Sequence, residues 1–290
     1  MSVRVFDALN AHIPHAITQY GIRPGDLDCL EKYGPQETVL LVGSYARNEA
    51  TAASDLDLAV LCGRPPAREP GTRGYPSVVG DSVVLKKING LDLTVEFIRR
   101  DVLLTISEVL DALPGSPDSP SLGNLGTLEL RTIERVSTGI VLQQAPADVA
   151  LMKSLDLGKA RANKAALAFL LAMGHLRAAT AGGSAAGARS LRLRESAQDL
   201  LIAEVNACGV LTFDSKHLVG RTQRLAAGSA RLLLDHLGAA ERESEVMERH
   251  IRLVAREFLA RADSEEGRSL IKALLAPIMT DLDATLTTAA

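Results

Sequence analysis

Short apolar runs alternate with turn-forming segments in the first half of this 290-residue chain. Val39–Val42 is a continuous apolar run that stops at Gly43, which predicts a buried strand. Leu56–Cys62 predicts a second strand. Residues 82–88 and 91–98 both have strand-like patterns, and the Asn89-Gly90 pair between them predicts a β-hairpin, because Asn-Gly favours tight two-residue turns.

Helical spacing surrounds these strands. Apolar residues spaced by four predict a helix over residues 3–20, and a second short helix is expected from Pro24 to Tyr33. Further helices are expected over 101–113 and from Thr127 onward. Proline and glycine mark residues 63–77 and 114–126 as loops.

From about Ala147 the pattern becomes almost entirely helical, with AGGSAAG as a flexible linker at residues 181–187. The expected helical segments are 148–180, 190–207, 216–237, 240–262 and 265–285. The sequence therefore predicts an α+β protein. An α/β domain with a small mixed sheet occupies residues 1–146, and an all-helical bundle occupies residues 147–290.

Composition narrows the functional classes. Hydrophobic residues make up 47% of the chain, enough for a sizeable core, and the net charge is −3 with a pI near 6.1. An acidic protein without an evident basic stripe is not expected to bind nucleic acid. Neither a signal peptide nor an apolar run long enough for a membrane span is evident. The three cysteines, Cys29, Cys62 and Cys208, lack metal-ligand spacing, so we expect reduced thiols and a cytoplasmic location.

The most informative segment is LLVGSYARNEATAASDLDLAVL, residues 40–61. Asp55 and Asp57 are two apart on a predicted strand, so their side chains share one face. Adjacent carboxylates repel each other unless a cation lies between them, and hard oxygen ligands suit Mg²⁺. Gly43 and Ser44 open a short helix, whose free backbone N–H groups suit a triphosphate.

This arrangement resembles the DNA-polymerase-beta-like nucleotidyltransferase superfamily, in which a strand, Gly-Ser, a small helix and Asp-x-Asp follow one another. The superfamily usually has glycine where this chain has Asn48, and asparagine tolerates the left-handed conformation better than most residues. The resemblance implies metal binding by Asp55 and Asp57. It also implies phosphate binding by Gly43 and Ser44, and we assign Arg47 and Ser54 to the nucleotide site as well.

A third carboxylate is expected from the predicted hairpin. Asp92, Thr94 and Glu96 alternate with apolar residues and share one face. Asp92 and Glu96 lie about 13 Å apart at ~3.3 Å per residue, so only one of them belongs at a metal centre. The segment LDLTV resembles the Leu-Glu-Val-Thr-Val stretch of streptomycin/spectinomycin adenylyltransferases, whose glutamate is the proposed base. That match favours Asp92 as base and metal ligand, with Glu96 as the alternative.

The helical half offers one further candidate. The same adenylyltransferase family places a Ser-Lys pair on the nucleotide phosphates, and Ser215-Lys216 is similar to it, which makes Lys216 a candidate nucleotide ligand. Arg231 and His236 fit the R-x4-H pattern of HEPN ribonucleases, a match expected by chance in a chain with 24 arginines and six histidines.

The expected activity is therefore transfer of a nucleoside monophosphate from ATP, or another NTP, to a small-molecule hydroxyl, with two Mg²⁺ ions. The resemblance and the acidic first domain, with 13 basic and 18 acidic residues up to Ala147, favour a cationic, aminoglycoside-type acceptor and hence antibiotic resistance. The alternatives are a toxin–antitoxin nucleotidyltransferase that AMPylates protein or tRNA, with a HEPN-like helical half, and a non-catalytic binding module. The helical domain is expected to close over nucleotide and acceptor. The oligomeric state is left open.

Overall fold

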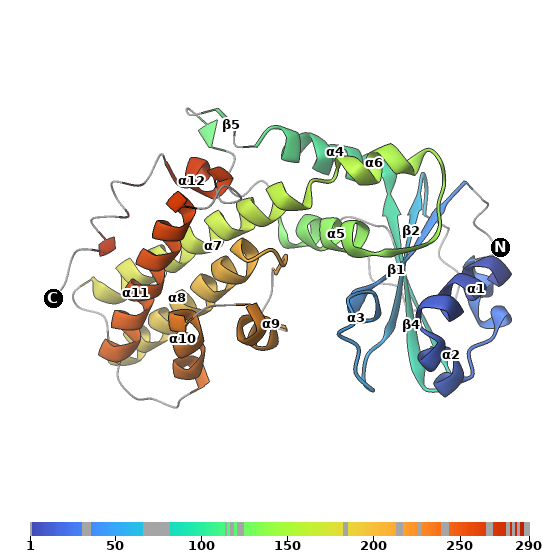
Figure 1. Ribbon diagram of the computed structural model, residues 1–290, viewed down its shortest axis with the longest axis horizontal. Helices are drawn as coiled ribbons and strands as arrows, with labels where there is room; N and C mark the ends of the chain where they lie inside the picture. The colour runs from blue at the N-terminus through green and yellow to red at the C-terminus, as the bar shows by residue number, and fades with distance from the viewer. Residues whose placement is uncertain are drawn as a thin grey trace. The chain divides into compact units, whose positions relative to one another are not determined.

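The computed structural model consists of two compact units, a mixed α/β unit and a helical unit (Figure 1). The first contains residues 1–111 and 126–157, and the second contains residues 112–125 and 158–290. The structure describes residues 2–30, 36–65, 82–113, 115–116, 119–120, 125–181, 185–212, 217–225, 228–238, 244–264, 269–276, 279, 282 and 285–286. The α+β class expected from the sequence is confirmed.

A five-stranded mixed sheet organises the first unit, in the order β3-β4-β2-β1-β7. Strands β2 and β4 run parallel, and each of the other neighbouring pairs is antiparallel. The bounds are β1 Thr38–Val42, β2 Leu56–Cys62, β3 Ser82–Ile88, β4 Leu91–Arg99 and β7 Ile140–Gln143. Four of these strands match the sequence prediction. The short edge strand β7 was not predicted, because four residues carry too little periodicity to stand out.

Two turns follow directly from local chemistry. Asn89 and Gly90 have φ values of 47° and 93°, so both central residues of the β3–β4 turn are left-handed, as the tight hairpin requires. Asn48, which takes the superfamily's glycine position, has a φ of 55°. The expectation that asparagine would adopt the left-handed conformation there is confirmed.

The helices of the first unit cover both faces of its sheet (Figure 1). α1 (Ser2–His12), α2 (Pro14–Tyr20) and the 3-10 helix η1 (Pro24–Leu30) bury apolar residues of β1, β2 and β4 on one face. α5 (Thr127–Thr138) lies against the other face, where Gly139 at its end approaches Leu40 and Val42. The remaining elements are α3 (Gly43–Ala46), α4 (Arg100–Asp111) and α6 (Asp148–Ser154).

Three predicted helical segments are each divided between two helices. The one expected over 216–237 is divided into α9 (Leu218–Leu225) and α10 (Gly228–Gly238). The helix expected over 3–20 breaks at Ile13, because Pro14 disfavours the helical conformation of the residue before it and itself starts α2. The helix expected over 148–180 is divided into α6 and α7 (Leu157–Thr180) at Leu155 and Asp156. The end of the helix predicted through Tyr33 and most of the predicted 63–77 loop lie outside the described residues, as does the centre of the 181–187 linker.

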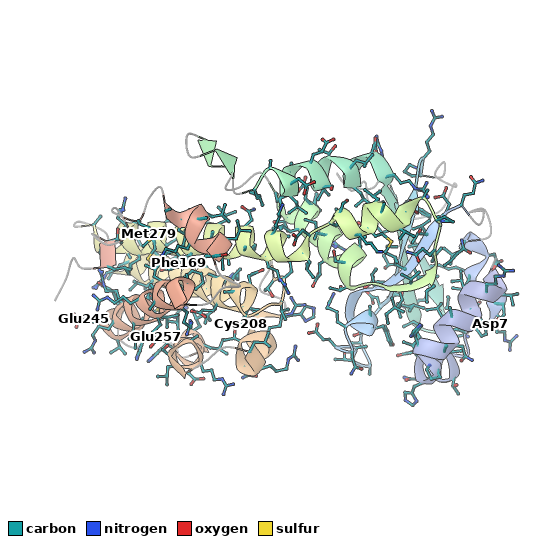
Figure 2. The ribbon with its side chains drawn as sticks, turned by 45° about the horizontal axis from the view of Figure 1, so that its top comes forward. Asp7, Phe169, Cys208, Glu245, Glu257 and Met279 are labelled. Atoms are coloured by element: carbon teal, nitrogen blue, oxygen red, sulfur yellow. The ribbon has the colours of Figure 1, made fainter. Side chains whose placement is uncertain are left out.

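The second unit is built around α7, α8 (Ala186–Ala207) and α11 (Ser244–Ser264). Phe169 of α7 stacks on Phe258 of α11 with ring centroids 4.8 Å apart, and both side chains are fully buried. Figure 2 labels Phe169 among the side chains of this unit. The other helices are α9 (Leu218–Leu225), α10 (Gly228–Gly238) and α12 (Ser269–Leu275). Residues 112–125 contribute the small β5–β6 ladder, Gly115–Ser116 and Ser119–Pro120. None of the described helices is long and apolar enough to cross a membrane.

Candidate active site

The Gly-Ser turn lies directly against the second aspartate of the Asp-x-Asp motif. Val42, the last residue of β1, pairs with Asp57 on β2. Gly43 then takes a φ of 72°, and a Cβ built on it would lie 2.2 Å from Asp57 Oδ2. No side chain larger than hydrogen fits there unless Asp57 moves. The glycine therefore allows the backbone that begins α3 to approach the carboxylate closely.

The loop between the turn and the aspartates is fixed by its own polar groups. Ser54 Oγ accepts a hydrogen bond from the Thr51 backbone N–H at 2.8 Å, and the Ser54 N–H donates to the Thr51 carbonyl at 3.0 Å. Arg47 Nε donates to Glu49 Oε2 at 3.0 Å, and its Nη1 lies 3.6 Å from Glu134 Oε1. The guanidinium of Arg47 is therefore engaged by two carboxylates.

The parallel pairing of β2 with β4 brings the aspartates of the two strands to the same end of the sheet. Asp57 pairs with Thr94 and Leu56 with Leu93. The same register continued by one residue sets Asp55 opposite Asp92. The side chain of Asp92 is 54% exposed, and Lys87 Nζ lies 3.7 Å from its Oδ1, a surface pair of little energetic weight. All three aspartates thus belong to the same end of the two strands.

Glu96, the alternative third carboxylate, has a different environment. It pairs with Ala59, two residues farther into the sheet than Asp57, and its side chain is only 5% exposed. It forms an ion pair with Arg135 of α5, whose side chain is 7% exposed. Burial lowers the pKa of Arg135, and the nearby charge of Asp57 raises it in partial compensation. Glu96 is thus an internal counter-charge rather than an exposed ligand.

The three aspartates suit a divalent cation such as Mg²⁺, because their carboxylate oxygens lie at a solvent-accessible end of the two strands. Within the parts of the chain that the structure describes, no three carboxylate, imidazole or thiol groups are already gathered closely enough to hold a metal ion. Asp55, Asp57 and Asp92 are therefore adjacent in register but do not converge on a preformed centre.

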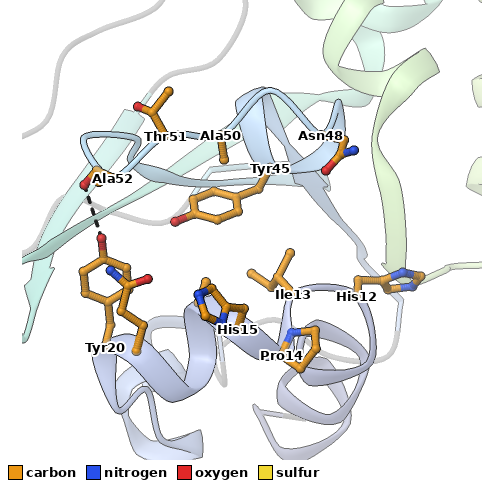
Figure 3. A pocket seen from close by; sticks show the side chains of 12 residues that line it. His12, Ile13, Pro14, His15, Tyr20, Tyr45, Asn48, Ala50, Thr51 and Ala52 are labelled. Atoms are coloured by element: carbon orange, nitrogen blue, oxygen red, sulfur yellow. Dashed lines mark hydrogen bonds between the residues drawn. The ribbon is translucent and has the colours of Figure 1, made fainter.

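A cavity of about 400 Å³ lies behind the loop, on the side of α1 and α2 (Figure 3). Tyr45 reaches over it from α3, while Ile13, Pro14 and His15 lie on the opposite side. Tyr20 Oη donates to the Ala52 carbonyl at 3.3 Å, which ties the loop to α2. Burial raises the pKa of Tyr45, and Tyr20 adds to the effect. None of the three aspartates lines this cavity.

Two predicted residues of the helical half have different outcomes. Lys216 lies outside the described residues, so its role stays a prediction. His236 of the R-x4-H match stacks on His250 with ring centroids 4.5 Å apart, and Arg231 is exposed on the same helix, α10. These contacts do not test the R-x4-H match, which stays a prediction.

Sequence reasoning missed the charged residues of α5. Glu134 and Arg135 stand between Ile133 and Val136, and all four side chains are buried. A Glu-Arg pair embedded in an apolar stretch was the available signal, because ionised side chains are rarely buried unless they are paired. Their partners, Arg47 and Glu96, are distant in sequence and could not be identified from it.

Comparison with known proteins agrees with this geometry. Residues 27–111 match the family model of the nucleotidyltransferase domain, and this stretch contains the Gly-Ser turn and all three aspartates. The chain is therefore a transferase of the nucleotidyltransferase class. More specifically, it contains a nucleotidyltransferase domain of the polymerase-beta-like superfamily, whose members typically transfer a nucleoside monophosphate from an NTP with the help of a divalent metal.

Among solved structures, eight chains match. One is a nucleotidyltransferase-like protein from Exiguobacterium sibiricum, with 14% identity over 96% of this chain and 89% of that chain and a TM-score of 0.40. No curated protein matches the chain.

Proposed function

We propose that the protein is a Mg²⁺-dependent nucleotidyltransferase that moves AMP from ATP to a hydroxyl group of a small cationic molecule, with aminoglycoside-type antibiotics as the leading class. The observation that carries the proposal is the shared strand edge of Asp55, Asp57 and Asp92, next to the glycine turn. Neighbouring strands lie ~4.8 Å apart, so side chains at one edge are within reach of shared cations.

Each residue has a defined task in this proposal. Asp55 and Asp57 hold the metal ions, which when bound neutralise charge on the triphosphate. Gly43 and Ser44 present backbone N–H groups to the phosphates. Asp92 takes the proton from the acceptor hydroxyl, and its exposure supports this role because the acceptor must reach it. Such reactions depend mainly on positioning and electrostatic stabilisation rather than on covalent chemistry.

Glu96 is a weaker candidate for the base. A general base must come within about 3 Å of the hydroxyl that it deprotonates. The buried ion pair with Arg135 holds Glu96 away from solvent, whereas Asp92 is open to it. These environments support Asp92, in agreement with the LDLTV resemblance.

The acidic first half and the adenylyltransferase resemblance support the cationic acceptor. An intact-mass screen tests this function with the purified protein, Mg²⁺, each NTP in turn and a panel that includes streptomycin and spectinomycin. We expect one acceptor to gain the mass of one nucleoside monophosphate, with pyrophosphate released, and Asp57→Asn to abolish the gain while leaving the fold intact. Mass added only to a protein or tRNA would favour the AMPylating alternative. No transfer to any acceptor with any NTP would count against the proposal.

A further inference from the structure

A buried ion pair lies beneath the aspartate edge of the sheet. Arg135 comes from α5 and Glu96 from β4, and both side chains are at most 7% exposed. An ionised group held out of water is tolerated only while an opposite charge compensates it. Arg135 therefore needs a carboxylate in this position whether or not a ligand is bound.

Two carboxylates can meet that need. Glu96 is the direct partner of Arg135. Asp57 also acts on Arg135, because its charge raises the pKa of the guanidinium. Asp57 pairs with Thr94 on β4. Glu96 lies on the same face of β4, two residues and therefore about 7 Å beyond Thr94. One buried cation is thus within electrostatic range of both carboxylates.

The second arginine of this region has its own counter-charges. Arg47 is held by Glu49 and Glu134 at 3.0 and 3.6 Å. Burial is the largest cause that lowers the pKa of Arg135, and repulsion from the positive charge of Arg47 lowers it further. The charges around the turn are therefore divided, with Glu49 and Glu134 balancing Arg47 and Glu96 balancing Arg135.

We propose that Glu96 is a positioning residue: its ion pair keeps the guanidinium of Arg135 at Glu96 and so weakens the interaction of Arg135 with Asp57. The inference rests on the proposed function, in which Asp57 binds a divalent cation. Without the charge of Glu96, Arg135 is still buried, and Asp57 is the remaining carboxylate that can compensate its positive charge. An Arg135–Asp57 ion pair then competes with the metal for the same carboxylate.

Binding of Mn²⁺ to the full-length protein without nucleotide tests this inference, with free Mn²⁺ followed by electron paramagnetic resonance. Glu96→Gln keeps the shape of the side chain and removes its charge. We expect the Kd for Mn²⁺ to rise about 10- to 100-fold, as when other outer partners of metal ligands are lost. The double variant Glu96→Gln/Arg135→Gln removes the competing cation as well, and its Kd should return to within about threefold of wild type.

Glu134→Gln is the matched control. It also removes a buried carboxylate, from α5, but Glu134 is a partner of Arg47 and not of Arg135. Its Mn²⁺ affinity should stay near that of wild type. Circular dichroism and thermal melting establish that each variant is folded. If Glu96→Gln does not fold, Arg135→Gln provides the test, and the inference expects its Mn²⁺ affinity to equal or exceed that of wild type.

The outcomes separate this inference from the proposed function. Wild-type protein that binds no Mn²⁺ contradicts the metal-dependent function itself. Wild-type affinity in Glu96→Gln overturns the positioning role and leaves the function standing. Weak binding that persists in the double variant also overturns it, since a residue that ligates the metal directly would give that result.

Discussion

Replacement of Gly43 by alanine tests how closely the turn packs against Asp57. The residue has a φ of 72°, a left-handed conformation that costs a residue with a Cβ about 1–2 kcal/mol. The new methyl group would also lie 2.2 Å from Asp57 Oδ2, whereas ordinary contacts begin at 3.4 Å. The carboxylate must therefore retreat by about 1 Å (3.4 minus 2.2). A displacement of that size at a reacting centre can lower the rate about 100-fold.

Gly21→Ala separates the two effects. Gly21 also has a left-handed φ, 57°, but the nearest atom to its built Cβ is 3.7 Å away, an ordinary contact. Both variants should lose about 1–2 kcal/mol of unfolding free energy in urea titrations. Only Gly43→Ala should also lose Mn²⁺ affinity and about 100-fold in turnover. Wild-type turnover in a folded Gly43→Ala protein would refute the close packing of the turn against Asp57.

Three further predictions concern other groups. Asp148 is fully buried and is bound by Thr38 Oγ1 at 2.7 Å and by Arg100 Nη2 at 3.0 Å, so Asp148→Asn should cost about 3 kcal/mol in chemical unfolding; an unchanged midpoint contradicts this. Asp92→Asn should lower kcat by about 100-fold, and Glu96→Gln by less; the reverse order would move the base to Glu96. Burial raises the pKa of Asp199, so the folded protein binds that proton more tightly than the unfolded chain does, and the group costs stability as pH rises. Asp199→Asn should therefore raise the melting temperature at pH 7, and the gain should vanish below about pH 3.8, the ordinary aspartate value.

The parts of the fold that the sequence predicted are those encoded locally. Val39–Val42 in β1 and Leu58–Cys62 in β2 are uninterrupted apolar runs, and Asn89-Gly90 determines the hairpin through two left-handed residues. Asn48 was predictable for the same reason, because few residues accept its φ of 55°. Where a few neighbouring residues determine the conformation, the pattern was sufficient.

The parts that the sequence did not predict depend on distant contacts. β7 is short and becomes a strand by pairing with β1, about a hundred residues earlier. The break at Ile13 was a missed local signal, since Pro14 stands in the sequence. For the site, alternation along β4 left Asp92 and Glu96 as alternatives. The buried environment of Glu96 depends on Arg135, a partner 39 residues farther along the chain. Long-range ion pairs of this kind leave no spacing in the sequence.

The position of the transferred phosphorus tests the central claim most directly. The full-length protein is incubated with Mg²⁺, the acceptor identified by mass, and ATP labelled at either the α- or the γ-phosphorus. Nucleotidyl transfer predicts that the α-label enters the acceptor, that the γ-label leaves in pyrophosphate, and that Asp57→Asn shows neither. A γ-label in the acceptor, with ADP as the second product, would contradict the account, because that outcome is phosphoryl transfer rather than nucleotidyl transfer.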